Sequence, residues 1–128
     1  EAIDAERGLP LAGCVAAGAT QLAFEQTERI DFGDFFNHPD LFVLTVSGES
    51  MIEAQIADGD YVVVRRQSTA QSGDMVVART DEGEATLKYW FPEKNGIRLQ
   101  PANSAMEPIF VKTAKVIGVV VGVVRSLR

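Results

Sequence analysis

The chain has 128 residues, of which 46% are hydrophobic and 23% are charged, and its formal net charge is −6. That length suits one compact domain, and the composition argues against collagen, a disordered tail and a disulfide scaffold. Residues 1–60 carry a net charge of −10 and residues 61–128 a net charge of +4. Nucleic-acid binders need clustered Lys and Arg. Because the only basic cluster is Arg65-Arg66, we do not expect this chain to bind DNA directly.

The chain start, the cysteine and the longest apolar run bear on targeting. Residues 1–6 have neither the basic end nor the apolar stretch of a signal peptide, and a start at Glu rather than Met predicts a fragment or a processed product. The single Cys14 cannot form an internal disulfide, which fits a reducing cytoplasm. The apolar run from Val116 to Val124 covers nine residues. A membrane span needs about 20 residues, so we predict a buried strand there and no membrane partner.

The first forty residues give weak structural signals. Residues 9–18 have almost no polar side chains and much Gly and Ala, so they can be extended without forming a stable helix or a long strand. Residues 30–36 alternate imperfectly between polar and apolar types. Asn37-His38-Pro39-Asp40 is a turn signal.

From residue 41 onward the pattern is typical of a β protein. Short segments rich in β-branched and aromatic residues are separated by Gly, Asp and Asn turns, which indicates a mostly antiparallel sandwich or barrel. One segment, Met51 to Ala57, is instead expected to form about two helical turns. The predicted strands are residues 41–46, 61–65, 75–79, 84–91, 97–100 and 116–125.

The segment Val46-Ser-Gly-Glu-Ser-Met51 is a candidate nucleophile site, because a strand end, a glycine, a serine and a short helix follow one another. The glycine permits a sharp turn, and free N–H groups at a helix start can stabilise an oxyanion. The alternative is that Ser50 only caps the helix, since serine is a preferred cap. A histidine triad is nearly excluded, because the only histidine, His38, lies in a turn where we expect a solvated side chain.

Lys88 is the candidate base. It lies in the strand Ala85-Thr-Leu-Lys-Tyr-Trp-Phe91, which is otherwise mostly apolar. Desolvation there would lower the pKa of the lysine and favour the neutral amine that a general base requires. Strand alternation places Thr86 on the same face, where its hydroxyl could orient the amine. The alternative is an edge-strand lysine that reaches water and discourages aggregation.

No metal or cofactor is expected. The sequence has no Cys/His cluster with metal-ligand spacing and no phosphate-binding glycine loop.

Several segments in order resemble the LexA family of SOS-response repressors, specifically its C-terminal self-cleaving domain. The resemblance covers the chain from about residue 8. It implies a mainly β, signal-peptidase-like fold of several antiparallel strands, with one short helix after the serine. The matching segments are Gly8–Gly18, Val46–Met51, Asp58–Tyr61, Gly73–Ala78, Ala85–Lys88, Pro101–Ser104 with Pro108-Ile109, and Gly118–Gly122.

The resemblance also implies a catalytic site, a Ser–Lys dyad in which Ser50 is the nucleophile and Lys88 the general base. The backbone N–H groups of Glu49 and Ser50 would form the oxyanion hole. The scissile bond would be Ala17–Gly18 of the same molecule, whose small residues suit a narrow cleft. Val15 would anchor the segment in an apolar pocket, and Thr86 would support the lysine.

The implied organisation is a linker end with the cleavage-site region over residues 1–30, and an autopeptidase and dimerisation domain over residues 31–128. The DNA-binding domain, through which operator DNA would be bound, is absent from this chain. A RecA filament on single-stranded DNA with ATP would favour the cleavage-competent conformer. Cleavage would inactivate the repressor in response to DNA damage. The resemblance further implies a homodimer that uses the 116–124 strand and a bacterial cytoplasmic location.

Three alternatives stay open. Cys14 lies close to the expected cleavage bond, and relatives of the UmuD type, self-processing accessories of translesion DNA polymerases, cut between Cys and Gly. A signal-peptidase-like enzyme acting on other proteins is disfavoured by the lack of a membrane segment. An inert β domain for dimerisation or binding would need Ser50 only as a cap.

Overall fold

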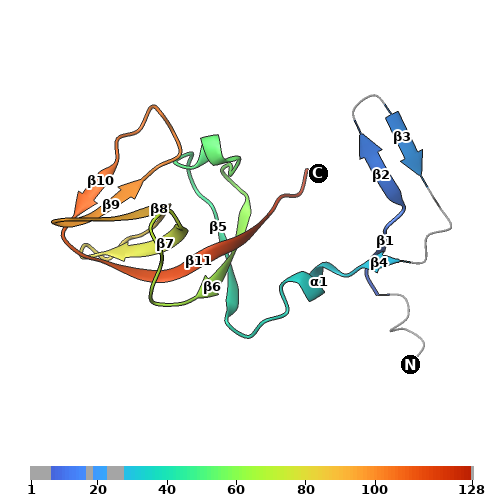
Figure 1. Cartoon of the computed structure of the whole chain (residues 1–128), viewed down its shortest axis with the longest axis horizontal. Coiled ribbons are helices and arrows are strands. Elements are labelled where there is room, and N and C mark those ends of the chain that lie inside the picture. The colour runs from blue at the N-terminus through green and yellow to red at the C-terminus, as the bar shows by residue number, and fades with distance from the viewer. Residues whose placement is uncertain (1–6, 17–18, 23–27, 128) are drawn as a thin grey trace. The chain divides into compact units, whose positions relative to one another are not determined.

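The structure is a computed structural model that describes residues 7–16, 19–22 and 28–127 (Figure 1). The chain divides into two units, residues 1–37 and residues 38–128. Among the described residues, no helix is long and apolar enough to cross a membrane.

In its described residues, the first unit contains two small antiparallel β-ribbons and one helical turn. Strand β1 (Leu9–Pro10) pairs with β4 (Arg29–Ile30), and β2 (Gly13–Ala16) pairs with β3 (Ala19–Leu22). Helix α1 (Phe32–Phe35) begins after Asp31, whose carboxylate accepts a hydrogen bond from the Gly33 N–H at 3.0 Å. The cap explains why the imperfect alternation of residues 30–36 ends as a helical turn rather than a strand.

The second unit is a seven-stranded sheet in which every neighbouring pair is antiparallel, in the order β10-β9-β8-β7-β11-β6-β5. The expected mainly β fold is confirmed, and each predicted strand is present with ends that differ by at most two residues. The strands are β5 (Leu41–Thr45), β6 (Tyr61–Arg66), β7 (Met75–Thr80), β8 (Ala85–Glu93), β9 (Gly96–Gln100), β10 (Ile109–Val111) and β11 (Ala114–Val124).

Strand β11 is the longest strand of the sheet and lies between β7 and β6 (Figure 1). It pairs with β7 as far as Val119 and with β6 as far as Val124. Gly118 passes so close to β6 that a Cβ there would lie 2.5 Å from the Arg65 carbonyl oxygen, which explains the glycine. The prediction of a buried strand is right only for the first half of β11. Its last residues are exposed, and within the described part of the chain only β6 pairs with them.

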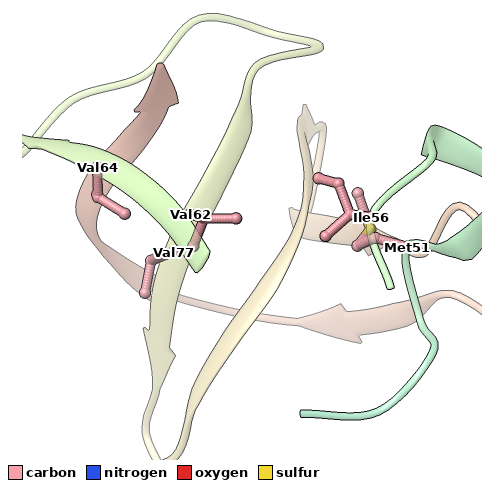
Figure 2. Packing of buried hydrophobic residues seen from close by; sticks show 5 residues of the cluster. All are labelled: Met51, Ile56, Val62, Val64 and Val77. Carbon is pink, nitrogen blue, oxygen red and sulfur yellow. The ribbon is translucent and has the colours of Figure 1, made fainter. Parts of the chain in front are cut away.

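The loop that follows β5 packs against the sheet through a hydrophobic cluster. Figure 2 shows the packed cluster, which joins two residues of that loop to three valines of the sheet. Burial of these two loop side chains anchors the loop on the sheet. The cluster consists of Met51, Ile56, Val62, Val64 and Val77.

The helix expected over residues 51–57 is much shorter than predicted. It is a single 3-10 turn, Ile52–Ala54, which ends at Gln55 in the left-handed region with φ of 69°. The left-handed Gln55 stops the helix there, and the Ile56 N–H closes the turn by donating to the Met51 carbonyl at 3.2 Å. Strand β10 was not predicted, because three residues after a proline carry no readable alternation.

Candidate active site

The loop between β5 and the 3-10 turn brings Ser50 into position. Gly48 has φ of 92°, and its N–H donates to Asp58 Oδ1 at 2.7 Å. The Val46 N–H donates to the Asp60 carbonyl, and the Gly59 N–H donates to the Val46 carbonyl, both at 2.8 Å. Residues 46–48 are therefore hydrogen-bonded to residues 58–60 just before the serine.

A second segment, residues 101–104, holds the backbone around Ser50 itself. The Ala102 N–H donates to the Ser50 carbonyl at 2.7 Å. Asn103 Nδ2 donates to the Glu49 carbonyl at 2.9 Å. This one segment therefore hydrogen-bonds the carbonyl groups of both Glu49 and Ser50.

The interpretation of Ser50 as a simple helix cap is wrong. The residue at the cap position of the 3-10 turn is Met51, and no side chain makes a capping bond there. Ser50 Oγ instead accepts a hydrogen bond from Lys88 Nζ at 3.3 Å. The half-buried serine is therefore joined to the lysine that the sequence singled out.

Lys88 is a central-strand lysine, which makes the edge-strand alternative wrong. Strand β8 lies between β7 and β9, and only 6% of Lys88 is exposed. Its Nζ also donates to Thr86 Oγ1 at 2.6 Å, so the predicted alignment of these two side chains is present. Burial lowers the pKa of the Lys88 amine from its ordinary value, because desolvation disfavours the charged form.

The serine and the lysine line a cleft of about 500 Å³ on the second unit. The cleft runs beside the end of β5 and the start of β8, and most of its walls are apolar. An amine with a lowered pKa beside a serine hydroxyl in such a cleft can take the hydroxyl proton and create a nucleophile. The apolar walls are formed by Leu44, Val46, Val62, Val77, Ala85, Leu87 and Met106.

The expected oxyanion hole has free donors. Within the described part of the chain, the backbone N–H groups of Glu49 and Ser50 donate to no other residue. Both residues line the cleft. Their N–H groups are therefore available to a bound carbonyl oxygen, as the resemblance implies.

The other predicted site residues belong to the first unit, residues 1–37. Ala17 and Gly18 lie outside the described residues. Val15 lies in β2 of the first unit and is 68% exposed, so its anchoring role stays a prediction. His38 is exposed, and its Nδ1 accepts from the Asp40 N–H. No group of three or more His, Cys, Asp or Glu residues in the described ranges could hold a metal ion.

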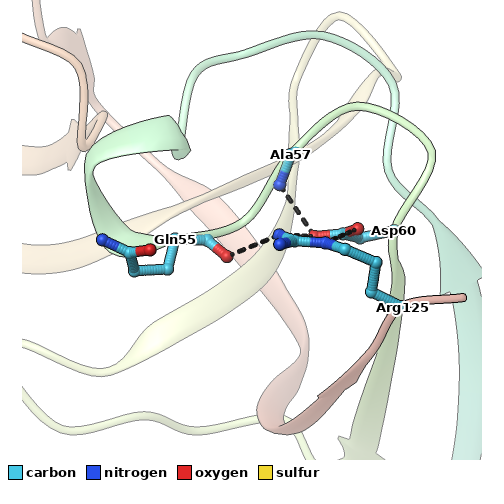
Figure 3. A network of polar contacts seen from close by, with 4 residues as sticks. All are labelled: Gln55, Ala57, Asp60 and Arg125. Atoms are coloured by element: carbon cyan, nitrogen blue, oxygen red, sulfur yellow. Dashed lines mark hydrogen bonds and ion pairs between the residues drawn. The ribbon is translucent and has the colours of Figure 1, made fainter. Parts of the chain in front are cut away.

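One polar network near the serine loop was not anticipated (Figure 3). The buried Asp60 carboxylate accepts from Arg125 Nε and Nη2, both at 2.7 Å, and from the Ala57 N–H at 2.8 Å. Arg125 Nη2 also donates to the Gln55 carbonyl at 3.0 Å. The Arg125 hydrogen bond and the Ala57 N–H together lower the pKa of the Asp60 carboxyl to about 2. Asp60 belongs to a recognised turn motif, but no sequence signal pairs it with an arginine 65 residues later.

Comparison with known proteins identifies the family of the chain. The family model of peptidase S24-like proteins matches residues 10–121. The LexA repressor of Alkaliphilus oremlandii (strain OhILAs) is 51% identical over 122 residues, which cover 93% of this chain and 58% of that repressor. The LexA repressor of Geobacillus thermodenitrificans (strain NG80-2) is 49% identical over 128 residues, which cover 94% of this chain and 59% of that repressor.

The chain therefore spans less than three fifths of the length of these relatives. The family match covers most of the chain, from just after its start to near its end. The resemblance drawn from the sequence motifs is confirmed, and the chain belongs to the peptidase S24-like family.

Proposed function

We propose that this chain is the C-terminal domain of a LexA-type SOS repressor that cuts its own Ala17–Gly18 bond with a Ser50–Lys88 dyad. The observation that carries the proposal is the buried Lys88 Nζ, 3.3 Å from Ser50 Oγ in an apolar cleft. Membership of a peptidase family supports a role for this pair in the hydrolysis of a peptide bond.

In the proposed mechanism, neutral Lys88 takes the proton of the Ser50 hydroxyl as Oγ attacks the carbonyl carbon of Ala17. The N–H groups of Glu49 and Ser50 bind the oxygen that becomes negative. The tetrahedral intermediate collapses by breaking the bond to the Gly18 nitrogen, which leaves as an amine with the proton from Lys88. Water, deprotonated by Lys88, then hydrolyses the Ser50 ester and restores the hydroxyl.

Two side chains would support the reaction. Thr86 Oγ1 accepts from Lys88 Nζ, which keeps the amine from rotating away from Ser50. Val15, two residues before the scissile bond, would anchor the segment by placing its exposed side chain in the apolar part of the cleft.

The biological role follows from the LexA repressors that this chain resembles. Residues 1–30 would be the linker end and cleavage region, and residues 31–128 the autopeptidase and dimerisation domain. Operator DNA would be bound by a domain of the parent protein outside these 128 residues. A RecA filament on single-stranded DNA with ATP would bind the cleavage-competent conformer better and so raise its population. The setting would be the bacterial cytoplasm.

The test is self-cleavage of the purified chain at alkaline pH without RecA, followed by mass spectrometry. We expect fragments that end at Ala17 and begin at Gly18, at a rate independent of protein concentration. Ser50→Ala and Lys88→Ala should each abolish the reaction. Ser72→Ala and Lys94→Ala, which change an exposed serine and an exposed lysine in turns, are the matched controls.

No cleavage at any pH, or cleavage that persists in Ser50→Ala, would contradict catalysis by the Ser50–Lys88 dyad. Cleavage beside Cys14 rather than after Ala17 would favour the UmuD-type alternative.

A further inference from the structure

We propose that Asn103 is a positioning residue for the oxyanion hole, because its side chain sets the direction of the peptide group between Glu49 and Ser50. This inference rests on the proposed function, since it concerns the same nucleophile. It starts from the hydrogen bond between Asn103 Nδ2 and the Glu49 carbonyl oxygen, 2.9 Å long.

The argument is one of peptide geometry. The Glu49 carbonyl and the Ser50 N–H belong to one planar peptide unit, and the described residues contain no cis peptide bond. In a trans unit the C=O and the N–H point in opposite directions. A donor that holds the carbonyl on one side therefore turns the N–H of Ser50 to the other side. That N–H is one of the two groups that the mechanism assigns to the oxyanion.

Two hydrogen bonds fix the orientation of the Asn103 side-chain amide. Its Oδ1 accepts from the Ala105 N–H at 2.9 Å, while its Nδ2 donates to Glu49. Each end of the amide meets a partner of the opposite kind, so a flipped amide would lose both bonds.

The loop that carries Asn103 is docked by other bonds as well. The Ala102 N–H donates to the Ser50 carbonyl, and the Glu53 N–H donates to the Ala102 carbonyl, both at 2.7 Å. Glu53 Oε2 accepts from the Ser104 N–H and from Ser104 Oγ, both at 2.8 Å. Removal of the Asn103 side chain should therefore leave the loop in place and isolate the effect of its amide.

One competing donor exists. The Ile52 N–H reaches the same Glu49 carbonyl at 3.3 Å, as part of the turn after the serine. That bond is longer than the Asn103 bond, and its donor lies within the turn itself. The experiment must therefore decide whether the turn alone orients the peptide.

The variants are Asn103→Asp and Asn103→Ala in the full chain. Aspartate has nearly the same shape and keeps an oxygen for the Ala105 N–H, but it removes the donor to Glu49. Ser104→Ala is the matched control, because it removes a side-chain bond of the same loop that touches neither Glu49 nor Ser50. The readouts are the self-cleavage rate against pH, the rate at which a fluorophosphonate labels Ser50, and the thermal unfolding midpoint.

We expect both Asn103 variants to lower the limiting cleavage rate and the labelling rate about tenfold to hundredfold, somewhat less than the loss of an oxyanion-hole donor outright. In Asn103→Ala the pH at half-maximal rate should not move, because Asn103 does not contact Lys88. In Asn103→Asp it should rise, because the new carboxylate favours the charged form of Lys88. The unfolding midpoint should stay close to that of the unchanged chain, and Ser104→Ala should keep the unchanged rates.

Rates within twofold of the unchanged chain in both variants would overturn the inference, and so would an equal loss in Ser104→Ala. A chain whose Ser50 is labelled but whose Ala17–Gly18 bond is never cut would overturn only the proposed self-cleavage, and the labelling rates would still decide the role of Asn103. If Ser50 of the unchanged chain resists the reagent, the oxyanion site and the role of Asn103 fall together.

Discussion

At the scale of the residue, the proposed mechanism makes activity depend on the charge of Lys88. The amine is nearly buried, and its two side-chain partners are the hydroxyls of Ser50 and Thr86. Hydroxyl groups carry no charge to offset the ammonium, so burial lowers the pKa of the amine. The same burial that costs stability for a charged lysine therefore prepares a neutral base.

The pH dependence of self-cleavage follows from this shift. The reaction needs the neutral amine, so its rate should rise with pH as Lys88 loses its proton. Because the folded-state pKa is lowered, the half-maximal rate should fall below the ordinary lysine value of 10.5. Rates measured from pH 6 to pH 11 on the unchanged chain test this. A rate that is flat with pH, or that begins to rise only above the ordinary lysine value, would contradict the role of Lys88.

Both members of the proposed catalytic pair could be predicted by residue-scale reasoning from the sequence. A serine after a strand and a glycine, and a lysine inside an apolar strand, are local patterns with known chemistry. The structure places them 3.3 Å apart although 38 residues separate them. The role proposed for Asn103 could not be predicted in the same way. It depends on the hydrogen bond to the Glu49 carbonyl, and no local sequence pattern predicts that bond.

At the scale of the element, six of the seven strands of the sheet could be predicted, and the short turn after Ser50 could not. Alternating apolar residues bounded by Gly and Asp turns are signals within a few residues of each strand. The helix expected after Ser50 failed for the opposite reason: it ends at the left-handed Gln55, whose carbonyl accepts from Arg125, far along the chain. Elements whose hydrogen bonds are non-local are the ones that sequence patterns miss.

The Asp60–Arg125 ion pair is another non-local interaction. It joins the turn before β6 to the residue that follows β11 (Figure 3). The pKa of Asp60 is about 2 in the folded chain, against 3.8 for an ordinary aspartate. The carboxylate therefore contributes stability that is present above about pH 4 and is lost as the pH falls toward 2.

We expect Asp60→Asn to unfold more readily than the unchanged chain at pH 7, with a difference that shrinks steadily as the pH falls from 4 toward 2. Urea unfolding at a series of pH values measures that difference. Glu82→Gln removes a negative charge from an exposed turn and serves as the control. A difference that stays the same from pH 7 down to pH 2.5 would show that the ion pair does not provide the stability.

At the scale of the whole molecule, the exposed end of β11 is the feature that a monomer does not explain. Beyond Val119 the strand has β6 on one side and no partner strand on the other in the described chain. Val121, Val123 and Val124 are exposed there, together with Tyr61, which pairs with Val124. An open strand edge with apolar side chains is a liability unless something covers it. A second copy of the chain would cover it, which is the homodimer that the resemblance implies.

The dimer can be tested by a charge placed in the middle of this surface. We expect the unchanged chain to sediment as a dimer at micromolar concentration and Val123→Asp to weaken that dimer at least tenfold, because a carboxylate would be desolvated in the interface. Phe110→Asp is the matched control, since Phe110 is also apolar and exposed but lies on β10, at an outer edge of the sheet. A concentration-independent monomer mass for the unchanged chain would contradict the dimer. Dissociation by Phe110→Asp alone would move the interface to β10.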